Sequence, residues 1–259
     1  MGGYHRNDWK IEEKADMAKE KVARKRLLKE PDEFITISAR MIGLLRHYGN
    51  WAMAFGVLIL LVGLGIWGWR QHQERTERQA MELQAQAQQV YRNALEQTDE
   101  TARRDLMAKA VDRFQKVIQQ YQGTHAAWVA RIYRGHACYA LGRYEEAIHD
   151  YESAMGTTPS GRDLQEMRAL ALQGLGYAWM AKGDRDKALE YFQLLKERGG
   201  APFQRTAQWN IARLLERQGR SEEALEIYKE IEKSFAEGYY GQLAKAKVAE
   251  LSKQGEGAR

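Results

Sequence analysis

An unbroken apolar stretch at residues 51–69 limits the possible fold of this chain more than any other feature. It reads WAMAFGVLILLVGLGIWGW and contains no charge, no proline and no amide side chain. A helix of this length spans roughly 28 Å, close to the roughly 30 Å hydrocarbon core of a bilayer. Trp51, Trp67 and Trp69 lie at its ends, where indole rings prefer the headgroup level. We therefore predict a transmembrane helix over residues 50–70, with Asn50 as its N-cap.

The position of this stretch favours a permanent anchor over a cleaved signal peptide. Fifty residues precede it, and neither an Ala-x-Ala pattern nor a cysteine for lipid attachment directly follows it. The alternative, a buried core helix, would need protein on every side.

Two further segments precede the span. Residues 1–33 form a charged tail of mixed sign, interrupted near its end by Pro31. Residues 34–49 predict an amphipathic helix that lies in the lipid headgroups or forms a docking face for a partner's membrane domain. Its apolar stripe consists of Phe34, Ile37, Met41, Leu44, Leu45 and Tyr48.

Charge favours one orientation in the membrane. Close to the span, the N-terminal side has two arginines and the C-terminal side has three, so the local count of basic residues does not indicate which side is cytoplasmic. These are Arg40 and Arg46 before the span and Arg70, Arg75 and Arg78 after it. Residues 1–50 carry 11 basic side chains, and basic tails stay cytoplasmic. We therefore expect a single-pass inner (plasma) membrane protein with a cytoplasmic N-terminus and a periplasmic C-terminal domain.

The region after the span contains an internal repeat. Three segments share a helix, a glycine turn and a second helix, and a small residue and an aromatic residue follow each glycine by five and nine positions. Glycine ends the first helix, alanine lets two helices approach closely, and the aromatic ring fills the gap between hairpins. A degenerate copy upstream has only Ala110 and Phe114. The three full sets are Gly142, Ala147 and Tyr151; Gly183, Ala188 and Phe192; and Gly219, Ala224 and Tyr228.

This pattern resembles the tetratricopeptide repeat (TPR) family. Its signature places are best matched by Leu175, Gly176, Trp179, Gly183, Ala188 and Phe192. The resemblance implies an all-α, TPR-like α-hairpin solenoid, which we place at residues 71–255. We expect residues 70–97 to continue the transmembrane helix and become the first helix of the degenerate repeat. Residues 239–253 then form a C-terminal capping helix.

The composition points away from catalysis and from nucleic acid. The formal net charge is only +5 and no long basic run occurs. The six histidines form no metal-ligand pair, Cys138 is the single cysteine, and neither a phosphate loop nor a Gly-x-Ser-x-Gly motif is found. We therefore expect a protein that is not an enzyme, with no catalytic residue, cofactor or metal site.

The first helix of each hairpin lines the concave side of such a solenoid. Projecting the repeat pattern onto these helices predicts a groove for a peptide with apolar anchors and some acidic character. The predicted groove residues are Ile132, His136, Tyr139, Gln173, Tyr177, Met180, Trp209, Asn210, Arg213 and Arg217.

The layout of tail, span and repeats is similar to the YfgM-type ancillary subunits of the SecYEG translocon. That resemblance implies a chaperone-like factor for exported proteins, with translocon subunits or a periplasmic chaperone as partners. The long basic tail and amphipathic helix depart from that pattern. The alternative is a scaffold or assembly subunit of an envelope or respiratory membrane complex. Either way, the expected partners are proteins at the groove and lipids around the span and the amphipathic helix.

Overall fold

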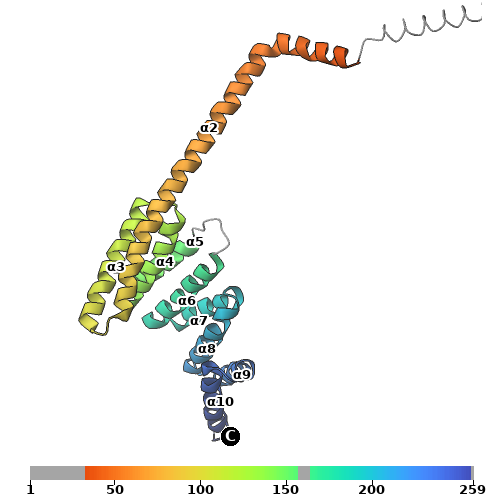
Figure 1. Ribbon diagram of the computed structural model, residues 1–259. Coiled ribbons are helices and arrows are strands. Elements are labelled where there is room, and N and C mark those ends of the chain that lie inside the picture. Colours follow the sequence, from red (N-terminus) through yellow and green to blue (C-terminus); the bar gives the residue numbers. More distant parts are fainter. Residues whose placement is uncertain (1–32, 157–163, 258–259) are drawn as a thin grey trace, which may run out of the picture. The chain divides into compact units, whose positions relative to one another are not determined.

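The computed structural model describes residues 33–156 and 164–257, with side chains described at 51, 53–156 and 164–254. The predicted tail and the predicted amphipathic stripe fall outside the described side chains. Every regular element in the described ranges is a helix (Figure 1). The helices are α2 Glu33–Glu96, α3 Glu100–Gln120, α4 His125–Ala140, α5 Tyr144–Gly156, α6 Leu164–Lys182, α7 Arg185–Arg198, α8 Ala201–Arg217, α9 Ser221–Ser234 and α10 Tyr239–Gly257.

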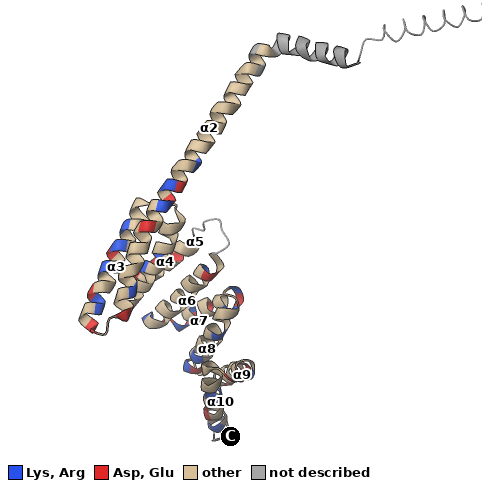
Figure 2. Cartoon of the chain, viewed as in Figure 1, with Lys and Arg blue, Asp and Glu red and all other residues tan. Residues whose placement is uncertain are grey.

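The chain divides into two compact units, one ending at Arg70 and the other starting at Gln71. In the first unit, α2 begins at Glu33, so Asn50 lies inside the helix and its prediction as an N-cap was wrong. The large apolar side chains from Trp51 to Trp69 are each at least 50% exposed, and this part of α2 carries no charge (Figure 2). Among the described residues, α2 is the one helix that is long and apolar enough to cross a membrane.

The second unit consists of stacked helical hairpins. Residues 71–96 of α2 pair with α3, and three further hairpins follow, α4 with α5, α6 with α7 and α8 with α9. The degenerate first repeat is confirmed, because Ala110 and Phe114 are fully buried and the Phe114 ring meets Tyr91 at 6.4 Å. The capping helix is confirmed as α10, which packs on α9.

The three turn glycines have the conformation that the sequence predicts. Gly142, Gly183 and Gly219 have φ of 78°, 88° and 78°, the left-handed region that disfavours a Cβ. In each turn, the next residue's N–H donates to the carbonyl five residues earlier, at 2.9–3.1 Å. This bond closes the first helix of each hairpin and reverses the chain into the second.

Aromatic residues of the second helices hold the hairpins together. Tyr151, Phe192 and Tyr228 are fully buried. The Tyr151 ring lies so close to α4 and α6 that a Cβ at Gly135 or Gly174 would stand 2.6 or 2.4 Å from it. The ring therefore bridges its own hairpin and the next one, as predicted from the spacing.

Two carboxylates tie further helices into this stack. Glu77 of α2 accepts hydrogen bonds from the N–H groups of His125 (3.0 Å) and Ala126 (2.9 Å), which caps the start of α4. Glu216 of α8 accepts from the Tyr228 hydroxyl (3.0 Å) and from Lys247 Nζ (2.8 Å). These bonds connect α2 with α4 and α8 with α9 and α10.

Replacing Gly174 by Ala tests the contact with Tyr151. The added methyl group must displace the Tyr151 ring, and such overpacking costs about 1–3 kcal/mol of unfolding free energy. We expect the Tm of the full-length protein in mild detergent, followed by circular dichroism, to fall by several degrees. Gly156→Ala is the control, because no heavy atom lies within 4 Å of a Cβ added there. Equal Tm values for the two variants would contradict this account of the stack.

Candidate protein-binding groove

The predicted groove residues lie on α4, α6 and α8, the first helices of the three full hairpins. The repeats place them at equivalent positions: Ile132 corresponds to Gln173 and Trp209, and His136 corresponds to Tyr177 and Arg213. Equivalent positions nevertheless differ in exposure, because each hairpin has different neighbours.

Two of the predicted residues are buried. Ile132 has no exposed surface and belongs to the main apolar cluster of the first two full hairpins. Asn210 is 2% exposed, and its amide donates hydrogen bonds to the Tyr177 hydroxyl (3.2 Å) and the Thr206 carbonyl (2.8 Å). Neither side chain is available to a ligand; Asn210 instead fixes the position of Tyr177.

His136 is held beneath the surface by the same aromatic residue that bridges the hairpins. Its Nδ1 lies 2.7 Å from the Tyr151 hydroxyl, and its ring also contacts Tyr133 at 6.1 Å. Burial lowers the pKa of His136 to about 4. The imidazole is therefore neutral at pH 7 and shares a hydrogen bond with the Tyr151 hydroxyl, which gives it a structural role.

The accessible part of the groove is an aromatic patch, which we define as Tyr177, Trp209 and Tyr240. All three side chains are partly exposed. Trp209 meets Tyr240 at 5.9 Å, and Tyr177 rests edge-on against the buried Phe192 at 5.3 Å. Rigid aromatic rings backed by a core are the residue types that dominate protein-binding surfaces.

Tyr240 was missed by the sequence prediction. It belongs to the capping helix α10 rather than to the first helix of a repeat. The only signal that could have found it is the aromatic pair Tyr239 and Tyr240 at the start of the predicted capping helix.

Two predicted cations flank this patch on α8. Arg213 is partly exposed, and among the described side chains no carboxylate pairs with it. Arg217 is exposed, and its carbonyl accepts a hydrogen bond from Arg185 at 3.4 Å. Their guanidinium groups can therefore pair with an acidic partner without first breaking an internal ion pair.

The other predicted groove residues are partly exposed on α4 and α6. Tyr139 packs against Tyr144 at 5.6 Å. Gln173 lies one turn before Tyr177 on α6. Met180 packs on the apolar cluster of the last two hairpins. Together with the aromatic patch they extend the candidate surface over the three full hairpins.

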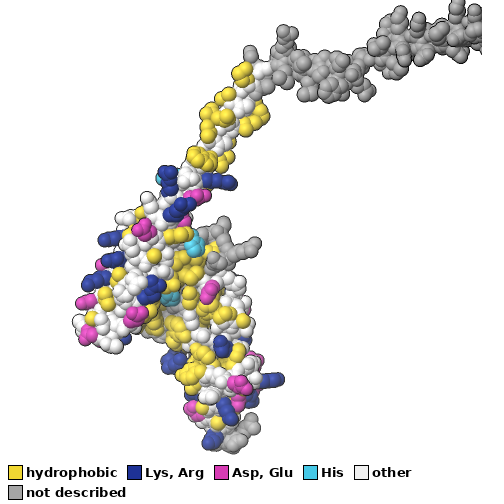
Figure 3. All heavy atoms as spheres, viewed as in Figure 1, with side chains coloured by type: hydrophobic (Ala, Val, Ile, Leu, Met, Phe, Trp, Pro, Cys, Tyr) yellow, Lys and Arg dark blue, Asp and Glu magenta, His cyan; other side chains and the backbone are white. Residues whose placement is uncertain are grey.

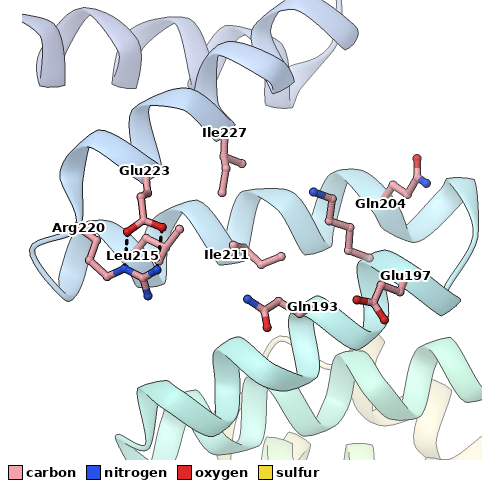
Figure 4. A pocket seen from close by; sticks show the side chains of 9 residues that line it. Gln193, Glu197, Gln204, Ile211, Leu215, Arg220, Glu223 and Ile227 are labelled. Carbon is pink, nitrogen blue, oxygen red and sulfur yellow. Dashed lines mark hydrogen bonds and ion pairs between the residues drawn. The ribbon is translucent and has the colours of Figure 1, made fainter.

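A hollow of about 640 Å³ lies on the face of α8 opposite the aromatic patch (Figure 4). Ile211 and Leu215 line it, whereas Trp209 and Arg213 belong to the groove. At about 100° per residue, these two pairs lie on opposite sides of the helix. The bidentate pair between Arg220 and Glu223, at 2.7 Å for both bonds, closes one end of this hollow.

The described side chains offer little for catalysis. No group of three His, Cys, Asp or Glu among them could hold a metal ion. Cys138 is buried, and burial raises its pKa to about 12, so it stays a thiol at neutral pH.

The His136 environment predicts a loss of stability in acid. The pKa is about 4 in the folded protein and 6.5 in the unfolded chain, so the unfolded chain binds the proton first as pH falls. The contribution is present above pH 6.5 and declines by up to about 3 kcal/mol towards pH 4. Denaturant unfolding of wild type and His136→Gln at a series of pH values measures it. A difference between the two proteins that does not vary from pH 7 to pH 4 would contradict this assignment.

Comparison with known proteins agrees with this geometry. The tetratricopeptide repeat family matches residues 134–202 and 174–239. Two crystal structures of a "putative kinesin light chain" from Podosopora anserina with nearly identical TPR-like repeats, one of them a Q17M variant, superpose with a TM-score of 0.54. They share 19% and 18% identity and cover 70% of this chain and 89% of theirs. No curated protein matches. Residues 134–239 thus match tetratricopeptide repeats, and the helical hairpins after the apolar stretch fold as a TPR-like solenoid.

Proposed function

We propose that this chain is a membrane-anchored TPR protein that binds other proteins at the periplasmic face of the inner membrane. Domains of this fold are generally non-catalytic scaffolds for protein–protein interaction. The observation that carries the proposal is the aromatic patch with the unpaired Arg213 beside it. Such a surface suits a peptide that offers an apolar anchor and a carboxylate.

The anchor in this proposal is the apolar part of α2. Its large side chains are at least 50% exposed on every side, whereas a core helix of a soluble protein would bury them. Figure 3 shows these side chains as a continuous apolar surface. Exposure of this extent in water is unfavourable, at about 25 cal/mol per Å², and a bilayer removes that penalty.

Within this frame we propose the domain boundaries 1–33, 34–49, 50–70 and 71–255 for the tail, interfacial helix, span and repeat domain. The partner set we favour is that of a translocon-associated, chaperone-like factor for exported proteins. This assignment is supported by the order of a basic tail, one span and a repeat domain.

Fusions at both ends test the anchor and its orientation. We expect alkaline phosphatase fused after residue 259 to be active and a fluorescent protein fused before residue 1 to fluoresce, with both remaining in the membrane fraction after carbonate extraction. Deleting residues 51–69 should release the repeat domain into the soluble fraction. A fluorescent protein that fluoresces when it is fused after residue 259 instead would show the opposite orientation. Full extraction of the intact chain by carbonate would exclude the anchor.

Charge reversal tests the groove. A photo-crosslinking amino acid at Ala181, which is exposed beside Met180 on α6, should capture partners in cells, read by mass spectrometry. We expect Arg213→Glu with Arg217→Glu to reduce this capture about tenfold or more, because an acidic partner is then repelled. The control is Lys196→Glu with Arg198→Glu, the same charge change on exposed positions of α7.

The identity of the captured proteins separates two functions. Translocon subunits together with a range of secreted proteins would support the export factor. One stoichiometric complex would support the scaffold of an envelope or respiratory assembly. Unchanged capture by the folded groove variant would show that the groove is not the binding site.

A further inference from the structure

Two arginines shortly after the apolar stretch are not explained by the groove or by the orientation of the chain. Arg75 and Arg78 are both exposed on α2, six and nine residues beyond Trp69. They lie on the side of the span that we assign to the periplasm, where the positive-inside rule gives no reason for cations.

Both side chains face away from the repeat domain. Ala80 is fully buried and marks the side of α2 that packs into the domain. At about 100° per residue, Arg75 and Arg78 lie about 140° and 160° from it around the helix. They are therefore on the side of α2 opposite the packed face, in the first turns of the second unit, where Figure 2 shows basic positions on the ribbon.

The neighbouring acids do not neutralise them. Glu77 uses both carboxylate oxygens to cap α4 through the N–H groups of His125 and Ala126, so its charge faces the domain. Glu74 stands 3.7 Å from Arg78, but both side chains are more than 60% exposed, and such surface pairs are worth little. Among the described residues no acid pairs with Arg75. Glu82, one turn beyond Arg78, is exposed on the same side and pairs with neither arginine among the described side chains. Both guanidinium groups are thus available to an anionic ligand.

The distance from the apolar stretch fits the headgroup layer. Arg75 and Arg78 lie about 9 and 14 Å along the helix from Trp69, and the headgroup regions add roughly 5–8 Å to each side of the hydrocarbon core. A tilted span and side chains that lie back along the helix bring both guanidinium groups to phosphate level.

We propose that Arg75 and Arg78 form a binding surface for the headgroups of anionic phospholipids. This inference rests on the membrane anchor of the proposed function. The two guanidinium groups bind headgroup phosphates by charge-assisted hydrogen bonds, and Glu77 keeps this surface connected to the repeat domain through α4.

Lipid competition tests the proposal. Full-length protein in mild detergent is mixed with equal amounts of phosphatidylglycerol and phosphatidylcholine, and the retained lipids are counted by native mass spectrometry. We expect wild type to prefer phosphatidylglycerol by on the order of tenfold, less at high salt. Arg75→Gln with Arg78→Gln should abolish that preference, and Arg75→Lys with Arg78→Lys should retain most of it. Lys196→Gln with Arg198→Gln, the same charge loss on α7, should behave as wild type.

A phosphatidylglycerol preference that survives in the Arg75→Gln, Arg78→Gln variant would overturn the proposal, as would its absence in wild type. Incorporation of the wild type into nanodiscs of phosphatidylcholine alone separates this failure from that of the anchor. A chain that enters neutral nanodiscs but shows no lipid preference refutes the lipid site alone. A chain that does not enter them refutes the anchor, and the lipid site with it.

Discussion

The contact of Tyr151 with two glycines is the interaction on which the stacking of the hairpins depends. Its ring fills the space between α4 and α6 because Gly135 and Gly174 have no Cβ to occupy it. Phe192 meets Gly176 equally closely, within the α6–α7 hairpin, where a Cβ would stand 2.7 Å from the ring. Packing at this density leaves little room for adjustment, so Tyr151 fixes the orientation of the α6–α7 hairpin on the α4–α5 hairpin.

The groove follows from that stacking rather than from its own residues. Because the first helices of successive hairpins turn the same face outward, Tyr177 of α6 and Trp209 of α8 come to one surface. Two predicted groove residues support the surface instead of binding a ligand: Asn210 donates to the Tyr177 hydroxyl, and the neutral His136 is hydrogen-bonded to Tyr151. No carboxylate among the described side chains pairs with Arg213, so its guanidinium group is available to bind an acidic partner.

Three carboxylates of the repeat domain join different helices. Glu77 caps α4 from α2, Glu216 connects α8 to α9 and α10, and Asp150 pairs with Arg134 between α4 and α5. Asp150 is 1% exposed, so loss of its partner would leave an unpaired charge in the core. These acids are turned inward, and arginines such as Arg75 and Arg213 are therefore free to meet partners outside the domain.

The local features of this protein could be predicted from its sequence. An uncharged run of nineteen residues predicts one long apolar helix from length and polarity alone. A glycine, an alanine and an aromatic residue at fixed spacing predict a turn, a close helix crossing and an inserted ring. The turn glycines, the buried Ala110 and Phe114 and the capping helix were predicted for that reason. The start of α2 was not, because Asn50 is an N-cap only if the helix begins there, and helix formers upstream extend it to Glu33.

Which groove residues are accessible was decided only by the tertiary structure. Periodicity assigns Ile132, Gln173 and Trp209 to the same position, yet Ile132 is covered by the apolar cluster around it, whereas Gln173 and Trp209 stay partly exposed. Tyr240 joins the patch from another element, and Glu77 reaches α4 across 48 residues of chain. The exposure of a side chain and its contacts depend on which helices pack side by side. Contacts between residues far apart in the sequence leave no periodic signal in it.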